Sequence, residues 1–224
     1  SFRREAFMKR DIVLFDLDGT VLDTHDAILA SMRYATRTVL GMEIPDEKLL
    51  SLVGQPLVTQ MRCFAPDADT ASEMLVAYRT HNESNLNETI SPFDGIDDVF
   101  CRLNAAGYTV GIVTSKRRAL AEESLIHFGL RDQLALVNGM EDSVAHKPDA
   151  EPLIQAAKDL GVSLDRCLYV GDSPYDLQAA RAAGIPSIGV TWGKFFSRPV
   201  LAAEHPANLI DSPDELFGAI RGLS

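Results

Sequence analysis

The feature that most constrains the fold is a series of short, unbroken apolar runs that each end at a polar residue or a glycine. Such runs are typical of strands buried on both faces of a sheet. They cover residues 12–15, 108–113, 134–137, 167–170, 187–190 and 208–210. Helices are expected at about 95–106, 117–128, 150–160, 174–183 and 213–220. This alternation predicts an α/β fold built on a Rossmann-like, doubly wound parallel sheet.

One region interrupts the alternation. Between Asp26 and Leu86 no strand is expected, and the pattern predicts three helices, at 27–40, 46–53 and 71–85. The chain therefore divides into a core domain of residues 9–23 and 91–224 and an all-helical insert of residues 24–90. The hinges between them are expected at 22–25 and 87–93. An insert placed here lies over the carboxyl end of the first strand, where ligands bind in open α/β sheets.

Composition limits the partners and the compartment. The 224 residues contain 21 Lys and Arg against 32 Asp and Glu, so the net charge is −11. A chain this acidic lacks the positive surface that binds nucleic acid or anionic lipid. No apolar run reaches the roughly 18 residues of a membrane span, and residues 1–8 lack the apolar stretch of a signal peptide. The 3 cysteines form no CxxC pair. We therefore expect a cytoplasmic protein with no nucleic-acid or membrane partner, for which Met8 is a candidate natural start.

Four polar motifs stand at or beyond the ends of predicted strands. They are Asp16-Leu17-Asp18-Gly19-Thr20, Thr114-Ser115-Lys116, Lys147-Pro148 and Gly171-Asp172-Ser173-Pro174-Tyr175-Asp176. A calcium loop starting at Asp16 is excluded, because its twelfth position is not acidic. Taken singly, Thr114 is explained as a helix cap, Lys147 as a solvated lysine and Asp176 by the helix dipole. Asp16 and Asp172 have no such explanation, because each follows a buried strand.

In this order and in this structural context, the four motifs resemble those of the haloacid dehalogenase superfamily of phosphatases. The resemblance covers nearly the whole chain. The helical insert is similar to the helical cap domain of that family. The resemblance therefore implies a Rossmann-like core that carries the chemistry and a cap that closes over it.

The resemblance also implies roles for the acidic residues. Asp16 would attack phosphorus and form an aspartyl phosphate, and Asp18 would act as the general acid and then as the base that activates water. Mg²⁺ would be held by Asp16, by the backbone carbonyl of Asp18 and by Asp172, and Asp176 would bind it through water or orient the ligands.

The remaining implied roles concern the substrate. Thr114 and Ser115 would grip phosphate oxygens, and Lys147 would balance the charge of the nucleophile and the phosphate. In the insert, Gln55, Arg79 and His81 are candidates for specificity. Arg79 would meet a carboxylate or a second phosphate in a bidentate way; an arginine on such a helix is also readily explained as a solvated surface residue.

The branches of the family differ in their chemistry. A dehalogenase expels halide, which needs no proton, so Asp18 favours phosphate chemistry. Phosphonatases use a cap lysine, and residues 52–57 contain none. The nearest resemblance is to bacterial phosphoglycolate phosphatases and a related pyrophosphatase. It is carried by Tyr78-Arg79 with His81-Asn82 and by residues 111–116, 146–149 and 189–193. A β-phosphoglucomutase-like mutase stays as a lesser alternative.

A different class of function is a non-catalytic metabolite-binding protein on the same fold. Such a protein would be expected to have lost one of the four central residues, and Asp16, Asp18, Lys147 and Asp172 are all present. The sequence therefore predicts a Mg²⁺-dependent phosphatase acting on a small phosphorylated, phosphoglycolate-like metabolite, with a pyrophosphatase as the alternative. A monomer and a homodimer are both compatible with it.

Overall fold

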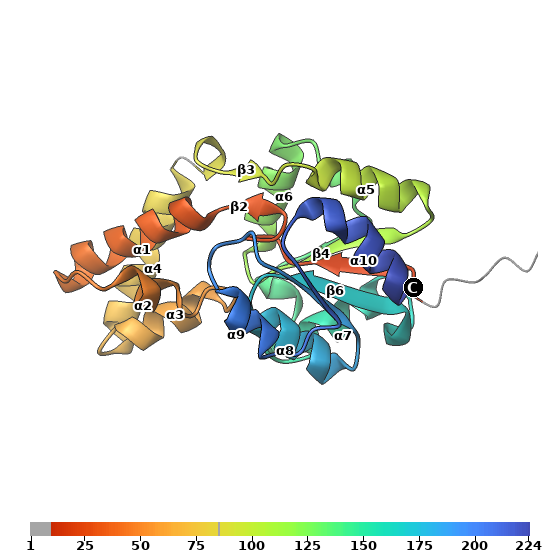
Figure 1. Ribbon diagram of the computed structural model, residues 1–224. Coiled ribbons are helices and arrows are strands. Elements are labelled where there is room, and N and C mark those ends of the chain that lie inside the picture. The colour runs from red at the N-terminus through yellow and green to blue at the C-terminus, as the bar shows by residue number, and fades with distance from the viewer. Residues whose placement is uncertain (1–9, 85) are drawn as a thin grey trace, which may run out of the picture.

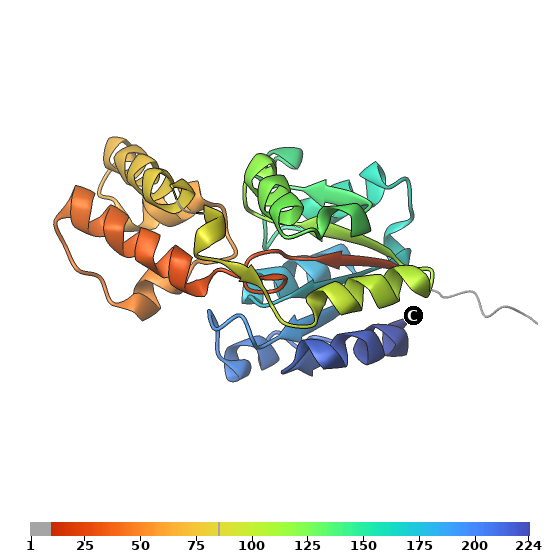
Figure 2. The same ribbon diagram turned by 90° about the horizontal axis from the view of Figure 1, so that it is seen from above.

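The computed structural model describes residues 10–84 and 86–224. Predictions that fall on residues 1–9, including the start at Met8 and the first residue of the core, lie outside the described residues, as does Asn85 at the end of a predicted helix. The described chain forms a sheet flanked by helices and, beside it, a group of helices (Figure 1). Seen from above, these two parts lie side by side (Figure 2).

The six predicted strands form one parallel sheet in the order β5-β4-β1-β6-β7-β8. Their bounds are β1 Ile12–Phe15, β4 Thr109–Val113, β5 Leu136–Asn138, β6 Cys167–Gly171, β7 Ser187–Val190 and β8 Asn208–Ile210. The strand order reverses at β1, so the chain leaves β1 toward β4 on one side and returns to β6 on the other. Phe15 stands opposite Ile112 and Val170, which brings the carboxyl ends of three strands level with one another.

Helices cover both faces of the sheet, as the doubly wound arrangement requires. One face packs against α5 (Ile96–Ala105), α6 (Arg118–His127) and α10 (Leu216–Leu223), and the other against α7 (Glu151–Asp159) and α8 (Pro174–Ala183). Phe15 contacts Phe100 of α5 at a ring-centroid distance of 5.1 Å. Leu14, which points to the opposite face, belongs to the cluster around Leu153 of α7. Both faces of β1 are therefore buried, which explains its unbroken apolar sequence.

The helical insert has a small core of its own. It consists of α1 (His25–Leu40), α2 (Asp46–Leu50), α3 (Leu57–Phe64) and α4 (Ala68–Glu83). Its fully buried side chains are Met32, Ala35, Leu49, Met61 and Met74. The sequence missed α3, because this short helix follows a turn at Gly54-Gln55-Pro56, and it extended the 46–53 helix past its end at Leu50. The α4 helix starts earlier than predicted, because the Asp67 carboxylate caps it by accepting from the Thr70 amide at 2.7 Å.

The chain crosses between the sheet and the insert twice, at adjacent places. Strand β2 (Leu22–Asp23) pairs antiparallel with β3 (Ser91–Pro92), and these strands lie within the two predicted hinges. Strands of two residues carry no detectable sequence period, which is why the sequence did not predict them. A short helix, α9 (Arg198–Ala202), was also missed. Within the described ranges, no helix has the length and apolar character needed to cross a membrane.

Candidate active site

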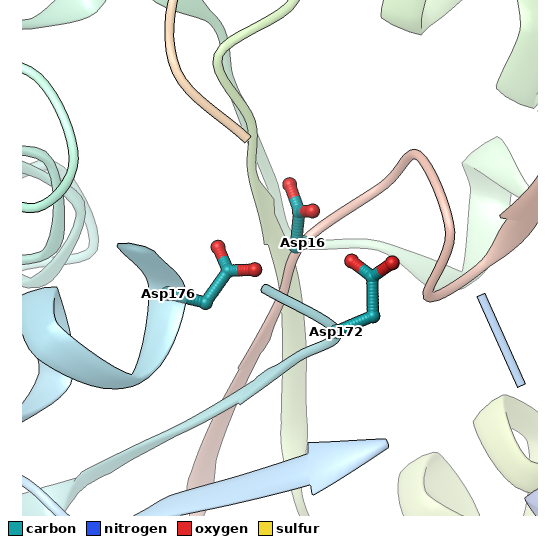
Figure 3. A group of neighbouring side chains, drawn as sticks. All are labelled: Asp16, Asp172 and Asp176. Carbon is teal, nitrogen blue, oxygen red and sulfur yellow. The ribbon is translucent and has the colours of Figure 1, made fainter. Parts of the chain in front are cut away.

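Three buried carboxylates meet at the carboxyl end of the sheet (Figure 3). Asp16 directly follows β1, Asp172 directly follows β6, and Asp176 lies in the first turn of α8. Because β1 and β6 pair in register, their ends bring Asp16 and Asp172 together. One oxygen from each of the three carboxylates lies within 4.8 Å of the others. Such a concentration of buried negative charge needs compensation from nearby cations.

Lys147 supplies part of that compensation. Its ammonium is 2 % exposed and donates to Asp16 Oδ1 at 3.0 Å, to Asp176 Oδ1 at 2.6 Å and to the Tyr169 hydroxyl at 3.0 Å. Burial alone would lower the pKa of Lys147, but the carboxylates of Asp16 and Asp176 raise it well above its usual value. The lysine therefore remains a cation. The solvated lysine that this position suggested when taken alone is not what the structure contains.

Two of the acids, Asp16 and Asp172, hold their protons more tightly than usual. Burial, together with the Asp176 charge, raises the pKa of Asp16 to about 7, against the opposing effect of Lys147. Burial and the Asp16 charge raise the pKa of Asp172 well above its ordinary value. Asp172 Oδ1 accepts from Thr20 Oγ1 at 3.3 Å, whereas Asp172 Oδ2 is buried and has no hydrogen-bond partner among the described residues.

Asp176 differs from the other two acids because both of its oxygens are occupied. Oδ1 accepts from Lys147, and Oδ2 accepts from the Ser173 amide at 3.0 Å and the Ser173 hydroxyl at 2.7 Å. Ser173 in turn caps α8. These contacts fix the Asp176 carboxylate, and Asp176 fixes Lys147. The oxygens that remain available to a cation therefore belong to Asp16 and Asp172.

The residues present fit a magnesium ion. Hard carboxylate oxygens are its preferred protein ligands, and it takes few of them. Three carboxylates around a single ammonium leave an excess of negative charge that a divalent cation would neutralise. The unpartnered Asp172 Oδ2 is a ready ligand atom. Glycines leave the space beside it open, since a Cβ at Gly19 or Gly193 would come within 2.1 or 2.2 Å of that oxygen.

Asp18 lies in the turn after Asp16, and its side chain is not one of the three clustered carboxylates. Its Oδ1 accepts from Lys116 Nζ at 2.8 Å, and both side chains are largely buried at the edge of a cleft. The sequence placed Lys116 in a motif but gave it no role. Tyr169, whose hydroxyl donates to the Val113 carbonyl at 2.8 Å, was also missed, although it is the one polar side chain in a run of apolar strand residues.

The cleft lies between the carboxyl end of the sheet and the helical insert. Predicted site residues from both parts line it, namely Asp16, Asp18, Thr114, Ser115, Gln55 and Arg79. The side chains of Lys147, Asp172 and Asp176 lie behind this lining. Ser115 also joins the two parts, because its hydroxyl donates to the Gly54 carbonyl at 2.7 Å.

His81 does not line the cleft. Its Nδ1 lies 3.0 Å from Ser31 Oγ, and its ring stacks on Tyr34 at a centroid distance of 4.7 Å. Both contacts are with α1, so His81 holds α4 to α1 inside the insert. The structure therefore offers no support for a role of His81 in specificity.

Comparison with known proteins decides the family. Residues 13–190 match the model of the haloacid dehalogenase-like hydrolases. The chain belongs to the haloacid dehalogenase-like hydrolases. The resemblance carried by the four motifs is thereby confirmed, and so is the Rossmann-like fold that it implied.

Proteins from several bacteria resemble the chain over most of its length. A Caldanaerobacter subterraneus subsp. tengcongensis protein with the provisional name pyrophosphatase PpaX is 35% identical over 215 residues, which is 96% of each chain. A Xanthomonas campestris phosphoglycolate phosphatase is 32% identical and matches 81% of this chain and 83% of its own. The crystal structure of a predicted phosphatase from Clostridium acetobutylicum superimposes with a TM-score of 0.85 at 28% identity, covering 96% of this chain and 99% of that one.

Proposed function

We propose that this hydrolase is a Mg²⁺-dependent phosphatase that hydrolyses a small phosphorylated metabolite through an aspartyl phosphate on Asp16. The observation that carries the proposal is the pairing of buried Asp16 with buried Lys147, beside an Asp172 oxygen that has no partner. The family and the phosphatase names of its relatives support the class of reaction. This combination binds a phosphate dianion only when a cation joins the carboxylates, which is why we include the metal.

The proposed reaction begins at Asp16, whose carboxylate attacks phosphorus while the ester oxygen leaves. Asp18 gives its proton to that leaving oxygen, then accepts a proton from the water that attacks the aspartyl phosphate. Phosphate departs and the Asp16 carboxylate is restored, so the net change is one ester and one water converted to an alcohol and phosphate. Lys147 keeps a positive charge next to the nucleophile throughout. Mg²⁺, held by Asp16, Asp172 and the Asp18 carbonyl, would neutralise charge on the phosphate oxygens.

Residues 24–90 would act as the cap domain over this centre. Thr114 and Ser115 would hold phosphate oxygens at the core side of the cleft, and Gln55 and Arg79 face it from the insert. Closing the insert over a bound phosphate ester would keep bulk water away from Asp16. The paired strands β2 and β3 would be the place where the two parts move relative to one another.

Two candidate substrates come from the names of the relatives. Phosphoglycolate would place its carboxylate on Arg79, and pyrophosphate would place its second phosphate there. A mutase like β-phosphoglucomutase would keep the same catalytic residues and lose the hydrolytic step. We also propose a cytoplasmic location and a monomer or homodimer, consistent with three free cysteines, of which Cys63 and Cys101 are exposed.

The test is phosphate release from a panel of phosphorylated metabolites and pyrophosphate, measured with Mg²⁺ and with EDTA. We expect phosphate release in the presence of Mg²⁺ and none in EDTA. In Asp16→Asn we expect kcat to fall by at least about 10³-fold while the protein remains folded. Asp94→Asn, which changes an exposed acid far along the chain, serves as the matched control. Wild-type turnover in Asp16→Asn would refute the nucleophile. No release from any compound would favour the mutase or the non-catalytic alternative.

A further inference from the structure

The end of the cleft that lies away from the carboxylates has a different chemistry. Its apolar lining includes Ala27, Ile28, Val53, Leu57, Leu86 and Ile90. Most of the charged side chains in the lining form ion pairs with one another: Lys116 pairs with Asp18, and Arg117 pairs with Glu83. Arg79 is the one charged lining residue for which the described part of the chain provides no ion pair. We refer to this part of the cleft as the chamber: its lining is mainly apolar, and Arg79 is its one charged residue without an ion pair among the described residues.

Two buried polar atoms in the same lining have no hydrogen-bond partner within the described residues. The first is Gln60 Oε1, on a side chain that is 6% exposed. Gln60 Nε2 donates to the Gln55 carbonyl at 2.9 Å, which fixes the amide and leaves its oxygen as the free atom. A buried polar atom without a partner is rare in proteins and calls for an explanation.

The second atom is the hydroxyl of Thr24, a residue that is 2% exposed. Thr24 stands at the N-cap of α1, where a threonine hydroxyl ordinarily accepts from a backbone amide of the first turn. It makes no such bond here. Gln60 comes from α3 and Thr24 stands at the start of α1, so two residues from separate elements that line one cleft each carry a buried polar atom without a hydrogen-bond partner.

We propose that the group released by this enzyme is an organic alcohol with an apolar carbon frame and a second hydrogen-bond donor, which binds Gln60 Oε1 and Thr24 Oγ1. An amide oxygen only accepts, so its partner must carry an O–H or N–H group. The carbon frame would displace water from the apolar walls. The inference rests on the proposed function, because the phosphate end must hold the transferred group at Asp16.

The same chemistry argues against the two substrates named for relatives. The second phosphate of pyrophosphate would bring concentrated negative charge into an apolar chamber that offers only Arg79. The glycolate carboxylate could pair with Arg79, but an ionised carboxylate has no proton to give to Gln60 Oε1. Neither a carboxylate nor a fully ionised phosphate can donate to Gln60 Oε1, so either group would leave that buried oxygen unpartnered, which costs binding free energy.

Paired probes test this directly. Each of a series of hydroxyalkyl phosphates is compared with the alkyl phosphate in which a methyl group replaces the terminal hydroxyl, and pyrophosphate and phosphoglycolate are measured beside them. For the chain length that reaches Gln60, we expect the hydroxyl compound to have a kcat/KM at least about tenfold above its methyl partner. We also expect it to exceed both pyrophosphate and phosphoglycolate.

Variants test whether Thr24 and Gln60 cause the preference for the hydroxyl compounds. Thr24→Val and Gln60→Met should each lower the hydroxyl-to-methyl ratio of kcat/KM toward one. Thr24→Val should not lower Tm, because its hydroxyl has no partner to lose, whereas a merely structural role would lower Tm and leave the ratio unchanged. Thr36→Val is the matched control on the same helix, since its hydroxyl bonds the Met32 carbonyl and lies outside this cleft. That control should keep the wild-type ratio.

The outcomes separate the inference from the function on which it rests. Equal kcat/KM for every hydroxyl and methyl pair, or a clear preference for pyrophosphate or phosphoglycolate, overturns the inference and leaves the phosphatase standing. A ratio that survives in both Thr24→Val and Gln60→Met also overturns it. Phosphate release from none of the compounds overturns the proposed function, and the inference with it. If Gln60→Met fails to fold, Thr24→Val and the wild-type series decide.

Discussion

The two ends of the cleft differ in whether their polar groups have partners. At the sheet end, charged groups are crowded together and nearly every one is bonded to another, so that Lys147 alone contacts three side chains. In the chamber under the helical insert, the walls are apolar and the few polar atoms, such as Gln60 Oε1, are unused. A cation would complete the first arrangement, and the ligand that we propose would complete the second.

This difference follows from the elements that build each end. The ends of adjacent parallel strands are held by the hydrogen bonds of the sheet, so Asp16 and Asp172 have little freedom to separate. The chamber is formed by short helices and a turn at Gly54 that touch the core through a few bonds, including Ser115 to Gly54. Under the proposed function, the reaction takes place on the rigid part, and the leaving group is recognised by the part that can change without disturbing it.

After Asp16→Asn, the largest expected effect comes from disrupting the crowded end of the cleft with Asp172→Asn. We expect Mg²⁺-dependent turnover to fall by at least about 10²-fold, because a ligand is lost. The free energy of unfolding without metal should instead be higher in Asp172→Asn than in the wild type. The folded pKa of Asp172 lies well above its ordinary value, so ionisation is unfavourable in the folded state and the amide removes that cost.

The pH dependence of Tm is a second test of the same variant. Asp16 has a folded pKa of about 7, above its ordinary value of 3.8, so the stability associated with its protonated form is present below about pH 4 and lost as pH rises through about 7. In EDTA, the wild-type Tm should therefore fall from about pH 5 to about pH 8, and Asp172→Asn should fall less. A Tm for Asp172→Asn below that of the wild type throughout this range would contradict the account; Asp94→Asn should follow the wild type.

The next effect comes from removing the central cation. Lys147→Met leaves Asp16 and Asp176 buried without their shared partner, and we expect the free energy of unfolding to fall by about 3–5 kcal/mol. The double variant Lys147→Met/Asp176→Asn should recover part of that loss, because one uncompensated charge is gone. Urea unfolding in EDTA measures both. Additive losses in the double variant would mean that the pair is not coupled as the distances indicate.

The sequence could predict the crowded end because its residues are tied to strand ends. Asp16 and Asp172 interrupt apolar runs, and parallel strands bring such residues to one edge, so their proximity followed from the fold class alone. The bonds among them did not follow. That Asp176 holds Lys147, or that Tyr169 bonds it from inside a strand, depends on side-chain directions that no spacing records.

The chamber was much harder to predict. Gln60 sits on α3, a helix whose eight residues are too few to show a clear period. Thr24 looked like an ordinary cap, and only the structure shows that its hydroxyl makes no cap bond. Of the proposed specificity residues, Gln55 and Arg79 line the cleft and His81 does not. The sequence could not show to which side of α4 the His81 side chain points.

A smaller effect is expected at the turn that joins the two ends, in Gly54→Ala. Gly54 has a φ of +106°, and a Cβ there would lie 2.7 Å from Ser173 Oγ, so either the turn or the Ser173 side chain must shift. We expect a loss of about 1–3 kcal/mol in stability together with a kcat/KM several-fold lower, since Val53, Gly54 and Gln55 line the cleft. Gly41→Ala is the matched control, because its φ is also positive at +64° but nothing lies near. It should lose stability and keep kcat/KM; equal activity losses in both variants would mean that strain, not the cleft, is responsible.

The smallest effect is expected from the ion pair that crosses the cleft, between Glu83 at the end of α4 and Arg117 before α6. Both side chains are 34% exposed, so water and salt screen the pair, and Glu83→Gln should change the free energy of unfolding by less than about 1 kcal/mol. Hydrogen bonds also hold the insert to the core, such as the one that the Tyr175 hydroxyl donates to the Ser51 carbonyl at 2.9 Å. If these bonds dominate, kcat/KM of Glu83→Gln should change by no more than about threefold, and the change should vanish at high salt. Asp46→Asn, which breaks a pair with Arg33 inside the insert, should leave kcat/KM unchanged. A tenfold or larger change in Glu83→Gln alone, persisting in salt, would show that the insert is positioned by charge and that its chamber depends on the charged groups after all.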